Sequence, residues 1–213
     1  MESAADYLPK NLSLTSLRTA AAGCHGCDLY KYATRTVFGE GRARARLLLV
    51  GEQPGDSEDR AGRPFVGPAG RILHQGLEAA GIAPRDIYVT NAVKHFKFIE
   101  RGKRRIHNKP KTIEIRACKP WLEAELEVVR PELIVALGAT AAQSLLGSTF
   151  RLLVSRGRVI AQPGLRAPVV PTIHPSAVLR APDSETRHAE MRKFIADLRI
   201  AAKALATGLP PAA

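Results

Sequence analysis

The chain has 213 residues, of which 45% are hydrophobic, so it is long and apolar enough to form one sizeable core and is not a disordered chain. Its 32 Lys and Arg residues outnumber 20 Asp and Glu residues, which gives a formal net charge of +12 and favours a polyanionic partner such as nucleic acid. No apolar run approaches the roughly 18 residues of a membrane-spanning helix, so we expect no contact with a membrane.

The predicted elements alternate between helices and strands. In chain order the pattern predicts a short helix (13–22), a buried strand (47–50), a helix (70–80), a strand (87–93), a polar loop (94–111), a helix bent at Pro120 (112–130), a strand (133–137), a helix (139–146), two strands (158–161 and 169–173) and an amphipathic helix (184–206). This alternation predicts a mostly parallel sheet with helices on both faces, in an α/β fold. We expect one domain over 1–213, with a flexible tail at 208–213. Function should lie at the strand ends.

The three cysteines favour metal chemistry over disulfides. Cys24 and Cys27 stand in a C-H-G-C pair, and Cys118 lies in a later helical region. His95, after the second strand, is our candidate for a fourth ligand. The alternatives are a buried apolar role for Cys118 and a DNA contact or simple solvation for His95. Zinc would also suit three cysteines and one histidine.

The segment after the second strand is densely cationic. Residues 103–111 read KRRIHNKPK and show no apolar period. We expect a loop whose Lys and Arg side chains contact phosphates or solvent. Neighbouring cations should favour the neutral imidazole of His107, whose lone pair could act as a nucleophile.

A second motif, GEQPGDSEDRAGRPFVGPAG, follows the first strand at 51–70. Glu52 lies at the strand end, where a carboxylate could activate a nucleophile or stabilise a cationic sugar. The acidic residues at 56, 58 and 59 are expected in a solvated turn. Phe65 is suited to stack on a flat ring, or it plugs the loop onto the core.

Two further polar residues follow strands. The carboxamide of Asn91 could pair with one edge of a base. The imidazole of His174, in the sequence H-P-S, could donate a hydrogen bond to a leaving group on which negative charge develops. Each of the two could equally be structural.

Taken together, GEQPG, RPFVGPAG, VTNAVKHFKF and HPS resemble the family 4-like branch of the uracil-DNA glycosylase superfamily. Gln53 and the KRRIH segment are similar, more narrowly, to the bacterial UdgX group. The resemblance implies a three-layer α/β/α sandwich and a 4Fe–4S cluster. Its ligands would be Cys24, Cys27, His95 and Cys118, with His95 at a position that family 4 enzymes fill with cysteine.

The resemblance also implies the roles of the other site residues. Phe65 would stack on a flipped uracil, Asn91 would read its edge, and Gln53 would belong to the substrate pocket. Glu52 and His174 would act in catalysis, and His107 would attack the sugar and stay attached to DNA. The remaining residues expected to contact DNA are Lys103, Arg104, Arg105 and Ser176.

The expected protein is thus a monomer that excises uracil from DNA, preferentially single-stranded, and becomes covalently linked to the abasic site. The alternatives are an ordinary hydrolytic glycosylase with multiple turnovers and a noncatalytic iron–sulfur module that binds nucleic acid or acts as a redox sensor. The N-terminus shows no signal peptide, so we expect a cytoplasmic bacterial protein.

Overall fold

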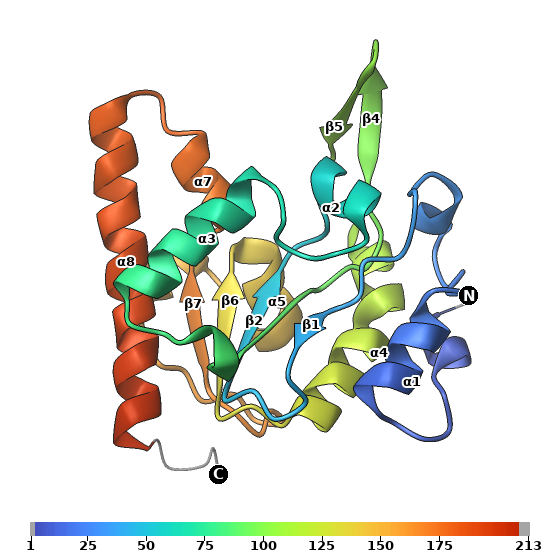
Figure 1. Cartoon of the computed structure of the whole chain (residues 1–213), viewed down its shortest axis with the longest axis horizontal. Coiled ribbons are helices and arrows are strands. Elements are labelled where there is room, and N and C mark those ends of the chain that lie inside the picture. Colours follow the sequence, from blue (N-terminus) through green and yellow to red (C-terminus); the bar gives the residue numbers. More distant parts are fainter. Residues whose placement is uncertain (1–2, 209–213) are drawn as a thin grey trace.

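A five-stranded sheet forms the centre of the protein in the computed structural model, which describes residues 3–208 (Figure 1). Its strand order is β1-β3-β2-β6-β7, with β1 antiparallel to β3 and the other pairs parallel. The strands are β1 (Glu40–Gly41), β2 (Leu47–Gly51), β3 (Ile87–Asn91), β6 (Leu133–Leu137) and β7 (Val169–Thr172), and a separate hairpin pairs β4 (Phe98–Arg101) with β5 (Arg104–His107). The expected α/β fold with a mostly parallel sheet is confirmed.

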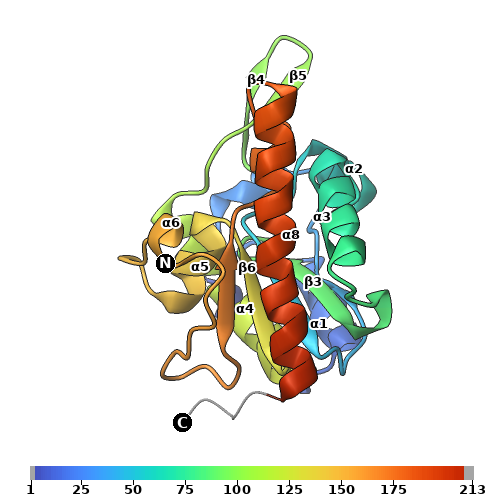
Figure 2. The ribbon, with the colours of Figure 1, turned by 90° about the vertical axis from the view of Figure 1, so that its left-hand side faces the viewer.

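Helices cover both faces of the sheet (Figures 1 and 2). The α-helices are α1 (Leu14–Ala21), α2 (Asp56–Ala61), α3 (Pro68–Ala79), α4 (Thr112–Val129), α5 (Ala139–Leu146), α6 (Leu152–Ser155), α7 (Pro175–Leu179) and α8 (Ser184–Thr207); the 3-10 turns are η1 (Ala4–Tyr7), η2 (Asp28–Lys31) and η3 (Pro84–Asp86). No helix in the described range is long and apolar enough to cross a bilayer.

Alternate residues of the central strands supply the two cores. Leu47 and Leu49 of β2 pack with residues of α3 and α8, whereas Leu48 and Val50 pack with residues of α4 and α5. Every residue of β2 and β6 is buried, as expected for parallel strands covered on both faces. A third cluster joins α1 and α4 around Trp121 and contains Cys24 and Cys118.

The structure corrects three expectations about local structure. The polar segment 94–111, predicted as a loop, contains the β4–β5 hairpin, which turns at Gly102 with a φ of 58°. A two-stranded ribbon has little stability of its own, and contacts with distant residues hold this one. The predicted strand at 158–161 forms only one isolated bridge, Ile160 to Val169. Of the expected tail 208–213, residues 209–213 lie outside the described range.

The acidic turn at 56–59 was the third wrong prediction. These residues begin α2, where Glu58 and Asp59 are buried. The Glu58 carboxylate accepts hydrogen bonds from the backbone N–H groups of Gly55 and Gly67, at 3.1 and 2.8 Å. The turn is therefore an anchor for the loop that carries Phe65, rather than a solvated segment.

Candidate active site

The carboxyl ends of the parallel strands meet at one edge of the sheet. Gly51 pairs with Asn91, and Leu137 pairs with Thr172, so the residues that follow these strands lie close together. A cavity of about 710 Å³ opens there. Seven residues singled out in the sequence line it: Glu52, Gln53, Phe65, Asn91, His107, His174 and Ser176.

Close packing fixes the position of Phe65 in this cavity. A Cβ atom at Gly51 would overlap the Asn91 carboxamide and the Phe65 ring, and one at Gly70 would overlap the Phe65 backbone. Phe65 itself has a φ of 54°, an unfavourable conformation for a bulky residue. Its ring lies 6.3 Å from that of His174, with an angle of 29° between the planes. The Phe65 ring therefore forms a rigid wall of the cavity.

A histidine and a carboxylate meet across the cavity. His107, the last residue of β5, places its Nε2 3.2 Å from Oε1 of Glu52. The other Glu52 oxygen accepts a hydrogen bond from the hydroxyl of Thr140 in α5. Burial would raise the pKa of Glu52, but the hydrogen bonds from His107 and Thr140 outweigh it and lower that pKa. Glu52 is thus an ionised acceptor beside a half-exposed imidazole.

His174 is held in one orientation. The backbone N–H of Ser176 donates a hydrogen bond to His174 Nδ1 at 3.1 Å, so the neutral imidazole carries its proton on Nε2. Burial lowers the pKa of His174 to about 4. The Ser176 hydroxyl lies 2.7 Å from Nδ1 and accepts a hydrogen bond from Arg180. At neutral pH His174 therefore presents an Nε2–H donor, which has no partner among the described residues.

The two carboxamides at this edge differ in what they bind. The Asn91 side chain is buried against the cavity and has no hydrogen-bond partner within the described range. Gln53, in contrast, donates to the carbonyls of Lys97 and Asn108 and accepts from the Lys97 N–H, each at 3.1 Å. Gln53 therefore bridges the two ends of the hairpin, and only Asn91 has a free amide to offer a ligand.

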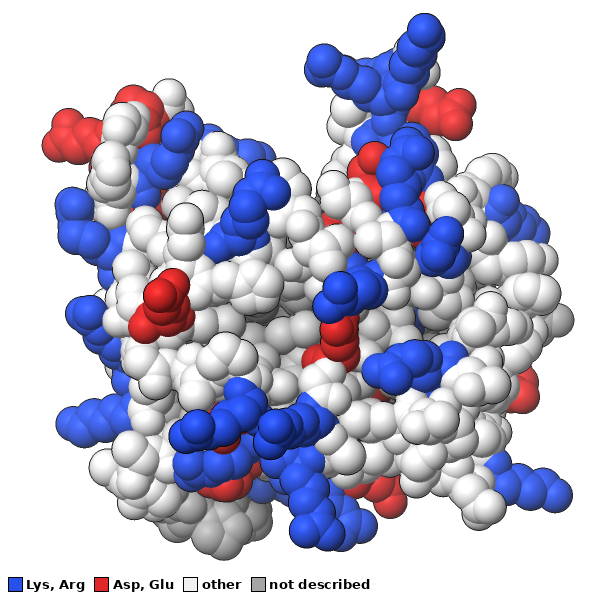
Figure 3. Space-filling view, in the orientation of Figure 1, with Lys and Arg blue, Asp and Glu red and all other residues white. Residues whose placement is uncertain are grey.

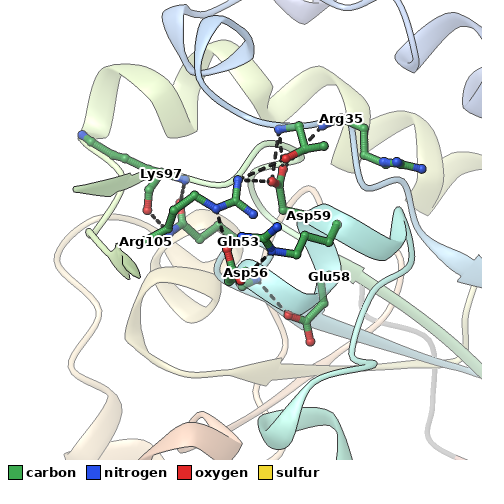
Figure 4. Close-up of polar contacts among 10 residues, drawn as sticks. Arg35, Gln53, Asp56, Glu58, Asp59, Lys97 and Arg105 are labelled. Carbon is green, nitrogen blue, oxygen red and sulfur yellow. Dashed lines mark hydrogen bonds and ion pairs between the residues drawn. The ribbon is translucent and has the colours of Figure 1, made fainter. Parts of the chain in front are cut away.

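Some basic side chains of the hairpin are exposed to solvent, and one is directed into the protein. Lys103 and Arg104 are exposed near the turn, in a region where cationic side chains gather (Figure 3). Arg105 points inward instead: its guanidinium pairs with Asp56 at 2.5 Å and Asp59 at 2.7 Å, and the Arg105 side chain is 13% exposed (Figure 4). These ion pairs fasten the hairpin to α2. The guanidinium of Arg105, which was expected to contact DNA, is therefore engaged in ion pairs within the protein.

A buried ion pair, which the sequence reasoning missed, supports the Asn91 segment. Lys94 Nζ lies 2.5 Å from the Glu125 carboxylate, and both side chains are fully buried. The same ammonium donates to the backbone carbonyl of Asn91 at 2.7 Å and to the Thr90 hydroxyl at 2.6 Å. Thr140, the partner of Glu52, was also missed. Thr140 closely follows the end of β6, and this position in the sequence could have indicated a place in the site.

The three thiols gather away from this cavity, in the cluster around Trp121. The indole N–H donates to Cys24 Sγ and the Lys94 backbone N–H to Cys118 Sγ, both at 3.2 Å. Burial raises the pKa of Cys118 to about 12, although the charge of Lys94 lowers it, so the Cys118 thiol needs a bound cation to exist as a thiolate. Thiolates are the ligands that soft metal centres use, so the chemistry of these side chains is compatible with a metal.

His95 is buried near this region, and its Nε2 lies 2.9 Å from the Thr36 hydroxyl. Burial lowers its pKa to about 4, so the imidazole is neutral, as a ligand must be. In the part of the chain that the structure describes, no three His, Cys, Asp or Glu side chains converge closely enough to hold one metal ion.

Comparisons with known proteins agree with this arrangement. Residues 38–199 match the family model of the Uracil DNA glycosylase superfamily. The relatives include the type-4 uracil-DNA glycosylases of Thermotoga maritima, 40% identical over 77% of this chain and 82% of the relative, and of Pyrobaculum aerophilum, 35% identical over 80% and 87%. That of Sulfurisphaera tokodaii is 33% identical over 90% of this chain and 87% of its own. This chain therefore belongs to the uracil DNA glycosylase superfamily.

Proposed function

We propose that the protein excises uracil from DNA and becomes covalently attached to the abasic site through His107. The observation that carries this proposal is the 3.2 Å contact between His107 Nε2 and the Glu52 carboxylate, in the same cavity as Phe65, Asn91 and His174. A nucleophile beside a base is the arrangement that nucleophilic catalysis needs. The type-4 relatives are named for uracil and DNA, which supports this substrate.

Binding begins with removal of the base from the stack. In duplex DNA this costs about a few kcal/mol, most of which a single strand avoids, so we expect single-stranded DNA to be preferred. The flipped uracil would lie against the Phe65 ring, and the free Asn91 carboxamide would pair with its edge. The net charge of +12 favours the phosphate backbone, with Lys103 and Arg104 available for contact.

The chemical step exchanges one bond at the anomeric carbon for another. His107 Nε2 forms a bond to the anomeric carbon and gives up its proton to the Glu52 carboxylate as that bond forms. The bond from that carbon to uracil breaks, and its electron pair leaves with the base. The Nε2–H of neutral His174 stabilises the uracil anion, which finally takes up a proton. The resulting bond to an imidazole breaks slowly, so the protein would turn over once. We also propose that it acts as a monomer made of one domain.

A denaturing gel tests this step. Wild-type protein mixed with uracil-containing single-stranded DNA should give a slowly migrating band that survives SDS and heat, and thymine-containing DNA of the same sequence should not. We expect His107→Ser to abolish the band, whereas the matched change of an exposed histidine, His188→Ser, leaves it intact. Abasic DNA without the band would identify a hydrolytic glycosylase, and absence of both products would identify a noncatalytic DNA-binding module.

The thiol cluster is proposed to hold a 4Fe–4S cluster, with Cys24, Cys27, Cys118 and His95 as ligands. Such a group would tie the N-terminal segment to α4. The three thiols lie in or against one buried cluster of side chains, which supports a shared centre with thiolate ligands. Iron and sulfide analysis of native protein tests this, and Cys118→Ser should lower the iron content. A colourless protein that contains zinc would overturn it.

A further inference from the structure

The outer face of the β4–β5 hairpin exposes two isoleucines side by side. Ile99 and Ile106 are paired across the two strands and are 43% and 39% exposed. Because side chains alternate along a strand, their face is opposite to that of Phe98 and His107, which are also paired. Arg105 packs over the Phe98 ring on that inner face, at 5.0 Å. The outer face is therefore free of the contacts that fasten the hairpin.

Two arginines share the outer face with the isoleucines. Arg101 and Arg104 are paired with each other one step nearer the turn, and both are exposed without an ion-pair partner among residues 3–208. An apolar pair flanked by two free cations matches a ligand with flat apolar groups on an anionic backbone. Single-stranded DNA has this chemistry.

One of the two isoleucines also adjoins the cavity. Ile106 lines it, as does the next residue, His107. A DNA strand with one nucleotide in the cavity would therefore bring the adjacent nucleotide close to Ile106. We infer that Ile99 and Ile106 form an apolar wedge against the base adjacent to the deoxyuridine, while Arg101 and Arg104 contact the phosphates beyond it. Side chains of this kind keep neighbouring bases unstacked when a base has been turned out. The inference rests on the proposed function.

The test uses the double variant Ile99→Thr, Ile106→Thr, which retains β-branched residues in both strands. The probe is a single strand in which a fluorescent purine analogue is next to uracil, on one side or the other. For one of the two strands, wild-type protein should change the fluorescence, and the double variant should not. The DNA concentration that gives half-maximal uracil excision should rise about tenfold in the double variant.

The matched control is Ile200→Thr, which changes an isoleucine of similar exposure (38%) on α8. It should behave as wild type. If the double variant keeps the fluorescence change and the half-saturating concentration, the wedge is refuted and the proposed function stands. If wild-type protein sediments as a dimer without DNA and the double variant as a monomer, the isoleucines form a protein interface and the wedge is again refuted. If wild-type protein excises no uracil from any DNA, both proposals fail.

Discussion

The buried pair of Lys94 and Glu125 gives the most quantitative prediction. Replacing Lys94 with Met removes the ammonium and leaves the carboxylate in a fully buried site. Loss of one partner of a buried ion pair costs about 3–5 kcal/mol. Glu125 would keep hydrogen bonds from the Tyr88 hydroxyl, the Thr90 hydroxyl and the Gly39 N–H, at 2.9, 2.9 and 3.1 Å. Because these remain, we expect the lower limit, about 3 kcal/mol.

For a chain of this size, such a loss lowers the melting temperature by roughly 6–12 °C. Thermal unfolding followed by circular dichroism measures it. The double variant Lys94→Met, Glu125→Gln should recover part of the loss, because a neutral amide replaces the unpaired charge. The Asn91 carbonyl loses a donor in both variants, so uracil excision should stay impaired even where stability recovers. A Lys94→Met protein that melts within about 2 °C of wild type would refute this account of the pair.

Three other predictions concern the cavity itself. Gly51→Ala should lower the excision rate at saturating DNA about a hundredfold, because its Cβ displaces the Asn91 carboxamide, which we propose to pair with the base; a single-turnover assay measures this, and a rate near wild type would contradict it. Gln53→Ala should speed amide hydrogen exchange in β4 and β5 and slow adduct formation about tenfold, since about 1–3 kcal/mol of hydrogen bonding to the hairpin ends is lost; unchanged exchange would show that the amide does not hold the hairpin. The pKa of His174 is about 4, below that of an unfolded imidazole, so the unfolded chain binds more protons at acidic pH and stability falls as the pH decreases. Between pH 7 and pH 5 His174→Asn should therefore lose about 2 kcal/mol less than wild type in urea unfolding, and equal losses would contradict the neutral assignment.

The sequence by itself determined the layout of the fold. Short, uniformly apolar segments such as Leu47–Gly51 and Leu133–Leu137 are typical of strands buried on both faces, and the helical periods between them indicate crossover helices and a parallel sheet. Because parallel strands end at one edge, Glu52 and Asn91 could be placed together without knowledge of any contact.

Only the tertiary structure decided the form and attachment of the hairpin. Arg105 binds Asp56 and Asp59, which lie 49 and 46 positions away in the chain, and Gln53 bridges backbone groups on both sides of the ribbon. Local sequence shows an arginine in a basic segment and an acidic turn, and both patterns are typical of solvated loops. In the structure, Arg105 and the two aspartates neutralise each other's charges. Such a pairing between distant segments leaves no periodic pattern in the sequence of either segment. The position of His107 beside Glu52 follows from those contacts.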